Sequence, residues 1–244
     1  MARRFFVEKT NINRNELTID GKEHLHLSKV LRAKINDEIS ISSKDMEYMC
    51  VIKSIEKSKT ICKILSKEKI VDKSPNITLF QASMKGEHME YAIQKATEIG
   101  IKTFVPFLSE FVVAKIDDKK IERFKKISQE ACKQSGRKQP MDVLGVKNFK
   151  EMLLSLKDYD KIIFAYEKST VSAKDVLFGL KETDNIALIV GSEGGFSEKE
   201  AKELVSCNAK DISLGENILR GETACLVLSS VVMYELGKFE KIWK

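Results

Sequence analysis

The sequence predicts an α/β protein in two parts: a small β-barrel at residues 1–72, and a larger domain at residues 73–244 with a mostly parallel sheet covered by helices. Short stretches that alternate in polarity or are rich in β-branched residues fill the first part. Beyond a polar segment at residues 71–76, apolar strands alternate with amphipathic helices. Hydrophobic residues make up 43% of the 244 positions, which is enough for packed cores and excludes a disordered chain.

Five stretches of the first part are typical of β-strands. They are FFVE, LTID, EISISS, YMCVIKSI and TICKIL, at residues 5–8, 17–20, 38–43, 48–55 and 60–65. Between the second and the third, residues 23–34 carry apolar side chains at helical spacing. Small β-barrels with one short helix often bind nucleic acid, so this part is a candidate RNA-binding domain.

The polar segment at residues 71–76 contains one of only three prolines and separates the two parts. After it we expect strands at 78–82, 103–107, 161–166, 186–190 and 211–214, with a short one near Val143. Helices are expected at 86–99, 119–135, 149–156, after Ser197, and at 223–236. Gly100 and Gly136 follow two of these helices, as C-terminal capping glycines do. Strands that alternate with helices imply a parallel sheet.

Composition and charge narrow the classes of function. The longest near-continuous apolar stretch has 11 residues, 224–234, whereas a bilayer span needs about 20. The N-terminus has no run long enough for a signal peptide, so we expect a cytoplasmic protein. The cysteine count of five is odd and no two cysteines have CxxC spacing, which argues against a disulfide framework. His24 and His26 form a His-x-His pair, but no third metal ligand accompanies them, which argues against a metal site. The net charge of +6 fits a polyanion partner, but a solvated lysine-rich surface fits it equally.

A glycine-rich loop, GSEGGF at residues 191–196, is the first candidate for chemistry. It follows a strand and precedes a helix whose start is marked by the capping box of Ser197 and Glu200. Its three glycines let the backbone approach a ligand closely. Glu193 would repel a phosphate, so a neutral or cationic ligand suits the loop better. The alternative interpretation is a tight strand-to-helix turn without a ligand.

A second loop, LGENILRGET at residues 214–223, leads into a helix with little polar surface, typical of a core or a subunit interface. Arg220 lies where the loop enters this helix. A positive charge there is unfavourable with the helix dipole, which indicates a functional role. An ordinary ion pair with Glu216 or Glu222 is the alternative. Because ligands bind at the carboxyl ends of parallel strands, we expect both loops to line one crevice.

Taken together, six motifs resemble the RsmE-type 16S ribosomal RNA uridine-N3 methyltransferases of the SPOUT superfamily. They are RRFF at 3–6, HLSKVLR at 26–32, KGEHMEYAIQKATEIG at 85–100, EACKQSGR at 130–137, VGSEGGFS at 190–197 and LGENILRGETA at 214–224. The resemblance covers nearly the whole chain. Three positions depart from the family pattern: Ser192 replaces a usual proline, Asn217 a usual arginine or similar residue, and Asn36 a usual glycine.

The resemblance implies a C-terminal SPOUT-type domain with a trefoil knot that binds S-adenosylmethionine, and an N-terminal PUA-like barrel that grips RNA. It implies a homodimer with the last helix near the interface, acting on 16S rRNA within the small ribosomal subunit, with no metal and no membrane. The expected cofactor contacts are Ile189, Gly191, Gly194, Gly195, Leu214, Gly215, Leu219, Arg220 and Thr223. The expected RNA contacts, chiefly to phosphates, are Arg3, Arg4, Lys29, Arg32 and Arg137.

The expected reaction is methyl transfer to N3 of a uracil base, for which positioning in line with the methyl carbon supplies much of the acceleration. Arg220 is the candidate for binding a uracil carbonyl oxygen and stabilising the uracil anion. Glu193 and Glu222 are alternative candidates for the base that removes the N3 proton. Two other functions stay open: a non-catalytic RNA-binding or ribosome-assembly factor of the same fold, and a SPOUT enzyme that modifies ribose 2′-OH in transfer RNA. The N-terminal barrel argues against the latter.

Overall fold

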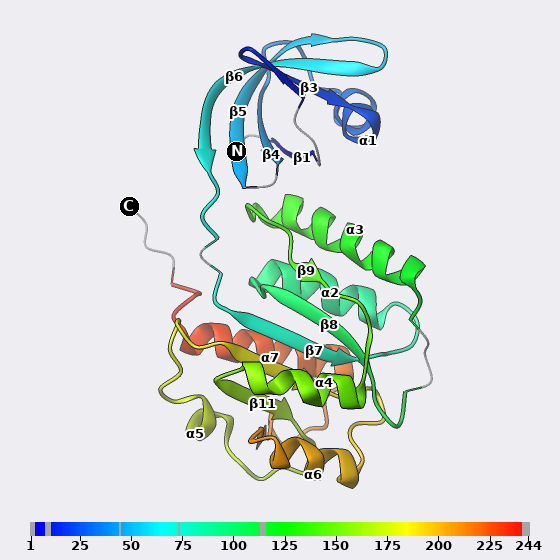
Figure 1. Cartoon of the computed structure of the whole chain (residues 1–244), viewed down its shortest axis with the longest axis vertical. Helices are drawn as coiled ribbons and strands as arrows, with labels where there is room; N and C mark the ends of the chain where they lie inside the picture. Colours follow the sequence, from blue (N-terminus) through cyan, green and yellow to red (C-terminus); the bar gives the residue numbers. More distant parts are fainter. Residues whose placement is uncertain (1–2, 8–10, 44, 73, 113–115, 241–244) are drawn as a thin grey trace. The chain divides into compact units, whose positions relative to one another are not determined.

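The computed structural model describes residues 3–7, 11–43, 45–72, 74–112 and 116–240, which form two compact units (Figure 1). The first unit is Met1–Lys73 together with Lys133–Gln139, and the second is Ser74–Cys132 together with Pro140–Lys244. The sequence indicated a change of rhythm at residues 71–76. It did not indicate that residues 133–139 group with the first unit.

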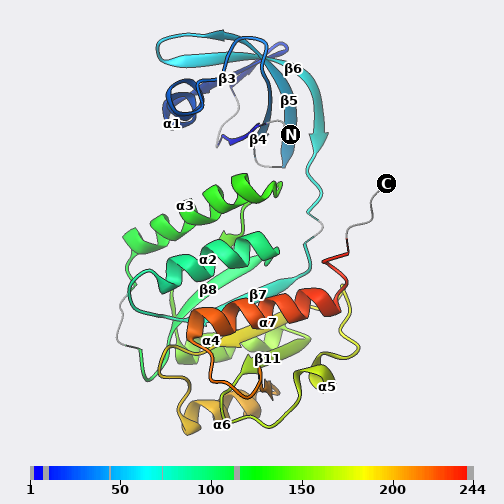
Figure 2. The same ribbon diagram turned by 180° about the vertical axis from the view of Figure 1, so that it is seen from behind.

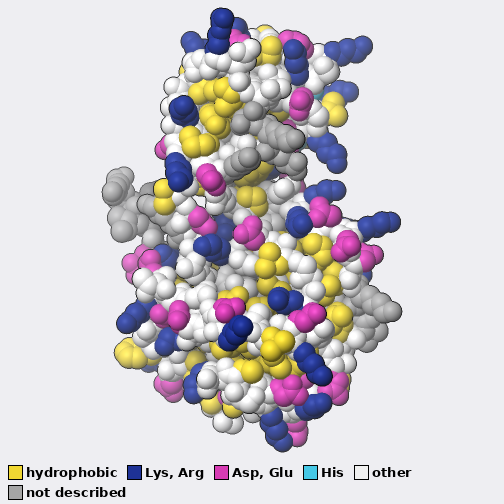
Figure 3. Space-filling model, in the orientation of Figure 1, with side chains coloured by type: hydrophobic (Ala, Val, Ile, Leu, Met, Phe, Trp, Pro, Cys, Tyr) yellow, Lys and Arg dark blue, Asp and Glu magenta, His cyan; other side chains and the backbone are white. Residues whose placement is uncertain are grey.

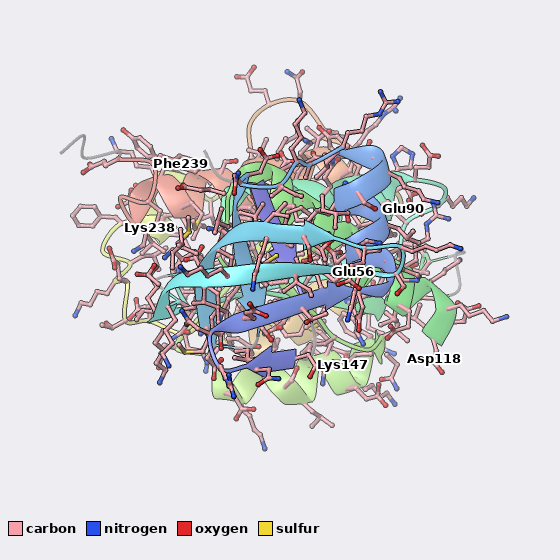
Figure 4. The ribbon with its side chains drawn as sticks, turned by 90° about the horizontal axis from the view of Figure 1, so that it is seen from above. Glu56, Glu90, Asp118, Lys147, Lys238 and Phe239 are labelled. Carbon is pink, nitrogen blue, oxygen red and sulfur yellow. The ribbon has the colours of Figure 1, made fainter. Side chains whose placement is uncertain are left out.

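The first unit is built on a six-stranded sheet in the order β1-β4-β5-β6-β3-β2, in which only β1 and β4 run parallel. Its strands are β1 (Arg3–Phe6), β2 (Asn11–Asn13), β3 (Glu16–Asp20), β4 (Glu38–Ser43), β5 (Met46–Ile55) and β6 (Lys59–Lys69). Figure 4 looks down on this sheet and labels Glu56, in the turn between β5 and β6. All five predicted strands are present, although Glu8 lies outside the described residues, and β2 is an additional strand.

The predicted helix at residues 23–34 is two short pieces: α1 (Gly21–Leu25) and a π-helix, η1 (His26–Val30). The amide of Leu31 donates to the carbonyl of His26 over 2.9 Å, the wide turn of a π-helix. Leu27 lies in the core while Val30 is 70% exposed, so the apolar face that the sequence indicated is only partly buried. His24 is buried, and its Nδ1 lies 2.8 Å from Oγ1 of Thr60, so it is a hydrogen-bonded core histidine.

A buried carboxylate, Glu47, organises a charged cluster in the first unit. It accepts hydrogen bonds from Arg4 at 2.6 Å and from Ser40 at 2.7 Å, and its other oxygen lies 2.8 Å from Nζ of Lys138. Burial raises the pKa of Glu47, but the hydrogen bonds from Lys138 and Ser40 and the charge of Arg4 outweigh it and lower the pKa to about 2.

The second unit is built on a parallel sheet in the order β10-β8-β7-β12-β11-β13, with the short β9 beside β8. The strands are β7 (Ile77–Ala82), β8 (Thr103–Leu108), β9 (Asp142–Val143), β10 (Lys147–Asn148), β11 (Lys161–Ala165), β12 (Ile186–Val190) and β13 (Lys210–Ile212). The helices are α2 (His88–Ile99), α3 (Asp118–Ser135), α4 (Phe149–Ser155), α5 (Ala173–Leu177), α6 (Glu198–Ser206) and α7 (Gly221–Glu235), with a 3₁₀ turn at Leu156–Asp158. The predicted helices are confirmed, and only the five-residue α5 was not expected.

Helices cover both faces of this sheet (Figures 1 and 2). Leu188 of β12 faces the core formed with α2, α3 and α7, whereas its neighbour Ile189 faces the core formed with α4 and α6. β12 is therefore buried on both faces, which fits its unbroken apolar sequence IALIV. Gly100 ends α2 with a φ of 108°, and the capping box of Ser197 and Glu200 starts α6, both as expected.

Two further properties follow from the described residues. No helix in the ranges given above is long and apolar enough to cross a membrane. All five cysteines are free thiols, and only Cys207 is not buried.

The Glu47 cluster predicts a defined pH dependence of stability. Because folding lowers the pKa of Glu47 from 4.5 to about 2, the carboxylate stabilises the folded state above pH 4.5, and this contribution is lost as the pH falls toward 2. We expect Glu47→Gln to lower the free energy of unfolding at pH 7 by about 3 kcal/mol, and the difference from the unsubstituted protein to disappear near pH 2. Urea denaturation at a series of pH values measures it.

Glu56→Gln is the matched control, because Glu56 pairs with Lys59 at an exposed position and exposed pairs contribute little. A Glu47→Gln protein whose difference from the unsubstituted protein does not change between pH 7 and pH 2 would contradict the assignment.

Candidate active site

Both glycine-containing loops line one pocket at the carboxyl ends of β11, β12 and β13, as expected. Three segments contribute to it: residues 165–167, residues 190–196, and most of residues 213–224. The volume of about 190 Å³ is more than ten times the roughly 10–15 Å³ that one water molecule needs. The pocket is therefore large enough for an organic ligand.

Close backbone packing explains the glycines of the GSEGGF loop. The amide of Gly195 donates to the carbonyl of Ser192 over 3.0 Å, and Gly195 has a φ of 68°, which disfavours any other residue. A Cβ on Gly194 would lie 2.8 Å from Cβ of Phe111. The loop therefore has no room for side chains at these two positions.

The loop is fixed from beneath by Gln81, at the carboxyl end of β7. Its amide Nε2 donates to the carbonyl of Gly191 over 2.9 Å and to that of Ala82 over 3.1 Å, and the side chain is fully buried. The sequence motifs did not single out Gln81 as a site residue. The available signal was a polar residue near the end of an otherwise apolar strand, ITLFQA.

The electrostatics of the pocket favour a cation. Glu167, Glu193 and Glu216 line it, and no Lys, Arg or His is among the described residues that do so. The Glu167 carboxylate lies close to the glycine loop, because a Cβ on Gly195 would be 3.0 Å from both of its oxygens. Such a site repels phosphate and fits the sulfonium and ammonium groups of S-adenosylmethionine.

The expected cofactor residues divide into two groups. Those that line the pocket are Gly191, Gly194, Gly195, Leu214, Gly215 and Leu219. Ile189 instead lies in the core between β12 and the helices, and Arg220 and Thr223 are outside the lining. The sequence motifs did not point to β11, whose end supplies Tyr166 and Glu167 to the pocket. The signal was the apolar strand at 161–166, which ends at the same sheet edge.

Arg220 is the N-cap residue of α7, and its side chain is exposed. In the part of the chain that the structure describes, no ion pair joins it to Glu216 or Glu222, so that alternative has no support. Glu193 is exposed and lines the pocket, and its Oε1 accepts a hydrogen bond from the amide of Lys85 over 2.8 Å. Glu222 lies on the first turn of α7, where its Oε1 is 3.2 Å from Nδ1 of His88. Glu193 thus contacts the connection between β7 and α2, and Glu222 contacts the first residue of α2.

The expected RNA contacts differ in accessibility. The Arg4 side chain is only 15% exposed, because besides Glu47 it binds the carbonyl oxygens of Gly136 and Arg137. Arg3 lies in β1 and Arg137 is half-buried, whereas Lys29 and Arg32 are exposed. Figure 3 shows basic and acidic side chains interspersed on the visible face, so no single-sign patch there marks an interface. Lys29 and Arg32 are the accessible candidates.

Known proteins with similar sequences are RNA methyltransferases, which fits a pocket suited to a sulfonium cofactor. Residues 72–233 match a family model described as the RNA methyltransferase domain. The Bacillus subtilis ribosomal RNA small subunit methyltransferase E is 34% identical over 95% of this chain and 96% of its own. The protein of the same name from Buchnera aphidicola subsp. Acyrthosiphon pisum is 33% identical over 98% of this chain and 96% of its own.

Solved structures give the same result. The Neisseria gonorrhoeae ribosomal RNA small subunit methyltransferase E, bound to S-adenosylmethionine, has a TM-score of 0.86 at 28% identity, over 98% of this chain and 100% of its own. A Legionella pneumophila structure with bound S-adenosylmethionine has a TM-score of 0.85 at 26% identity, over 96% and 98%. These matches confirm the predicted fold class and the prediction of an S-adenosylmethionine-dependent methyltransferase. The chain belongs to the ribosomal RNA small subunit methyltransferase E family.

Proposed function

We propose that this protein transfers the methyl group of S-adenosylmethionine to N3 of one uridine in 16S rRNA of the small ribosomal subunit. The observation that carries the proposal is the acidic, glycine-lined pocket, whose lining suits a sulfonium cofactor better than a phosphate. The names of the relatives support the RNA of the small subunit as the substrate. Ribosomes assemble in the cytoplasm, where we propose that the protein acts.

The residues of this chain divide the work of the reaction. The glycine loop and the loop at residues 213–219 bind the cofactor, and Glu167, Glu193 and Glu216 favour its positive charge. When bound, S-adenosylmethionine supplies an activated methyl group. Arg220, exposed at the start of α7 and beside the lining residues Leu219 and Gly221, donates to a uracil carbonyl oxygen and stabilises the anion that forms on the base.

A second copy of the chain completes the proposed enzyme. α7 is apolar, yet one face is only partly covered: Val227 is half-buried, Val231 is half-buried against the core, and Tyr234 is 73% exposed. These positions are spaced by four and three residues, so they share a face of the helix. An exposed apolar face that follows a catalytic loop fits a homodimer interface.

The cofactor placement predicts the effect of a side chain in the loop. Gly194→Val should abolish binding of S-adenosylmethionine measured by calorimetry, because even a Cβ would approach Phe111 to 2.8 Å and displace the loop. Gly145→Val is the matched control, since a Cβ there meets nothing within 4 Å. Unchanged affinity in a folded Gly194→Val protein would refute the placement.

The role of Arg220 predicts a catalytic defect without a stability defect. Arg220→Ala should lower the rate of methyl transfer in single-turnover assays by about 100- to 1,000-fold, with mass spectrometry identifying N3-methyluridine as the product of the unsubstituted enzyme. Arg220→Lys should recover little, because an ammonium lacks the two-donor fork. The melting temperature should stay the same, since Arg220 has no ion pair to Glu216 or Glu222 within the described residues. Near-normal turnover by Arg220→Ala would end the assignment.

The dimer predicts a measurable change in mass. Sedimentation equilibrium at micromolar concentration should give twice the 27.7 kDa of the chain, and Val227→Glu should give the monomer by placing a charge on the apolar face. Glu235→Gln, at an exposed position near the end of the same helix, should leave the dimer intact. A monomeric unsubstituted protein would count against the interface.

The RNA contacts predict a separation of binding from cofactor affinity. Changing Lys29 and Arg32 together to alanine should weaken RNA binding and reduce its salt dependence, because fewer counterions are released. Calorimetry with S-adenosylmethionine should show unchanged affinity, since neither residue lines the pocket. The same double change at Lys57, in the turn between β5 and β6, and at Lys59, the first residue of β6, tests whether any loss of positive charge has this effect.

A further inference from the structure

Glu222 combines three properties that packing alone does not explain. Its side chain is only 12% exposed, and its Oε1 lies 3.2 Å from Nδ1 of His88. Its Oε2 is shielded from water and has no hydrogen-bond partner among the described residues. A shielded carboxylate oxygen without a donor is costly, and the cost is relieved if a ligand group takes the place of the atoms that shield it and donates to this oxygen.

The neighbouring groups do not provide that donor. Burial raises the pKa of the Cys225 thiol to about 12, with the charge of Glu222 adding to the shift, so the thiol stays protonated without bonding the carboxylate. Arg220 is exposed and makes no ion pair with Glu222 within the described chain. His88 binds the other oxygen and is 42% exposed, so it lies at the surface.

The alternative base, Glu193, is placed differently. It is exposed, and its Oε1 already accepts the amide of Lys85. It also lines the acidic pocket, where its negative charge favours a cationic cofactor. Protonation of Glu193 would therefore weaken the cofactor site, whereas Glu222 lies outside the lining.

We propose that Glu222, positioned by His88, is the base that accepts the N3 proton of the target uracil. The inference rests on the proposed function and assigns one of its steps. The N3–H bond breaks, the proton goes to Oε2 of Glu222, and the electron pair stays on the uracil, where Arg220 stabilises the charge. The proton leaves before the methyl group arrives, because both occupy the same direction from N3. Methyl transfer then forms the N3–C bond and leaves the electron pair of the broken C–S bond on sulfur.

The same arrangement selects the base. Uracil presents an N3–H donor between two carbonyl acceptors, which matches a carboxylate acceptor beside the donor Arg220. Cytosine has no hydrogen on N3, so its lone pair would face the Glu222 carboxylate and repel it. Glu222 is thus both the base and a determinant of specificity for uracil.

The test uses the acidity of the substrate. Small ribosomal subunits are reconstituted with 16S rRNA transcribed with either uridine or 5-fluorouridine, whose N3–H is more acidic because fluorine withdraws electrons. With uridine, Glu222→Gln should lower the single-turnover rate by about 100-fold or more, the effect of removing a general base. With 5-fluorouridine the loss should shrink to less than about 10-fold. His88→Leu should show a smaller loss that 5-fluorouridine also reduces and that His88→Gln, which keeps a donor, largely restores.

The control is Glu90→Gln, at a position on the same helix as His88 (Glu90 is labelled in Figure 4). This change breaks the 2.8 Å ion pair between Glu90 and Arg123 and should leave the rate unchanged with both RNAs. Equal losses with uridine and 5-fluorouridine would assign Glu222 a structural role and overturn the inference, as would a near-normal rate. These outcomes presuppose that the unsubstituted enzyme makes N3-methyluridine. Failure to do so would refute the proposed function itself.

Discussion

The hydrogen bond from the buried Gln81 amide to the carbonyl of Gly191 is the contact on which the site depends. The same carbonyl oxygen also lies close to the start of α7, because a Cβ on Gly221, the first residue of that helix, would lie 3.4 Å from it. One peptide group therefore connects the central strand β7, the glycine loop and the start of α7. The pocket, the proposed base and Arg220 all take their positions from this junction.

Charge is distributed so that two oppositely charged ligands meet. The pocket lining is acidic among its described residues and suits a cationic cofactor, whereas accessible basic side chains such as Lys29 and Arg32 suit a polyanionic RNA. Glu222 belongs to neither group: it is a carboxylate outside the pocket lining, largely shielded from water and bound by His88. Keeping the base out of the cofactor site lets it change protonation without altering the charge that binds the cofactor.

Local sequence patterns predicted those features that depend on neighbouring residues alone. The capping box at Ser197 and the glycine after α2 marked helix ends, and the order of strands and helices brought the two loops to one edge. These patterns did not predict features that depend on contacts between residues far apart in the sequence. Arg4 was predicted to contact RNA, yet its guanidinium donates hydrogen bonds to Glu47 and to the carbonyl oxygens of residues 136 and 137. No local pattern marked the π-helix at His26–Val30, and the pairing of His88 with Glu222 joins residues from two helices far apart in sequence.

The grouping of residues 133–139 with the first unit has a consequence for how the gene can be dissected. A fragment that stops at residue 73 would carry Glu47 without Lys138, and Arg4 without the carbonyl oxygens of Gly136 and Arg137. The two units are thus interleaved along the chain, and no single cut yields both intact. Recombination between relatives at residues 71–76 would exchange half of a charged cluster, so the halves have to be inherited together.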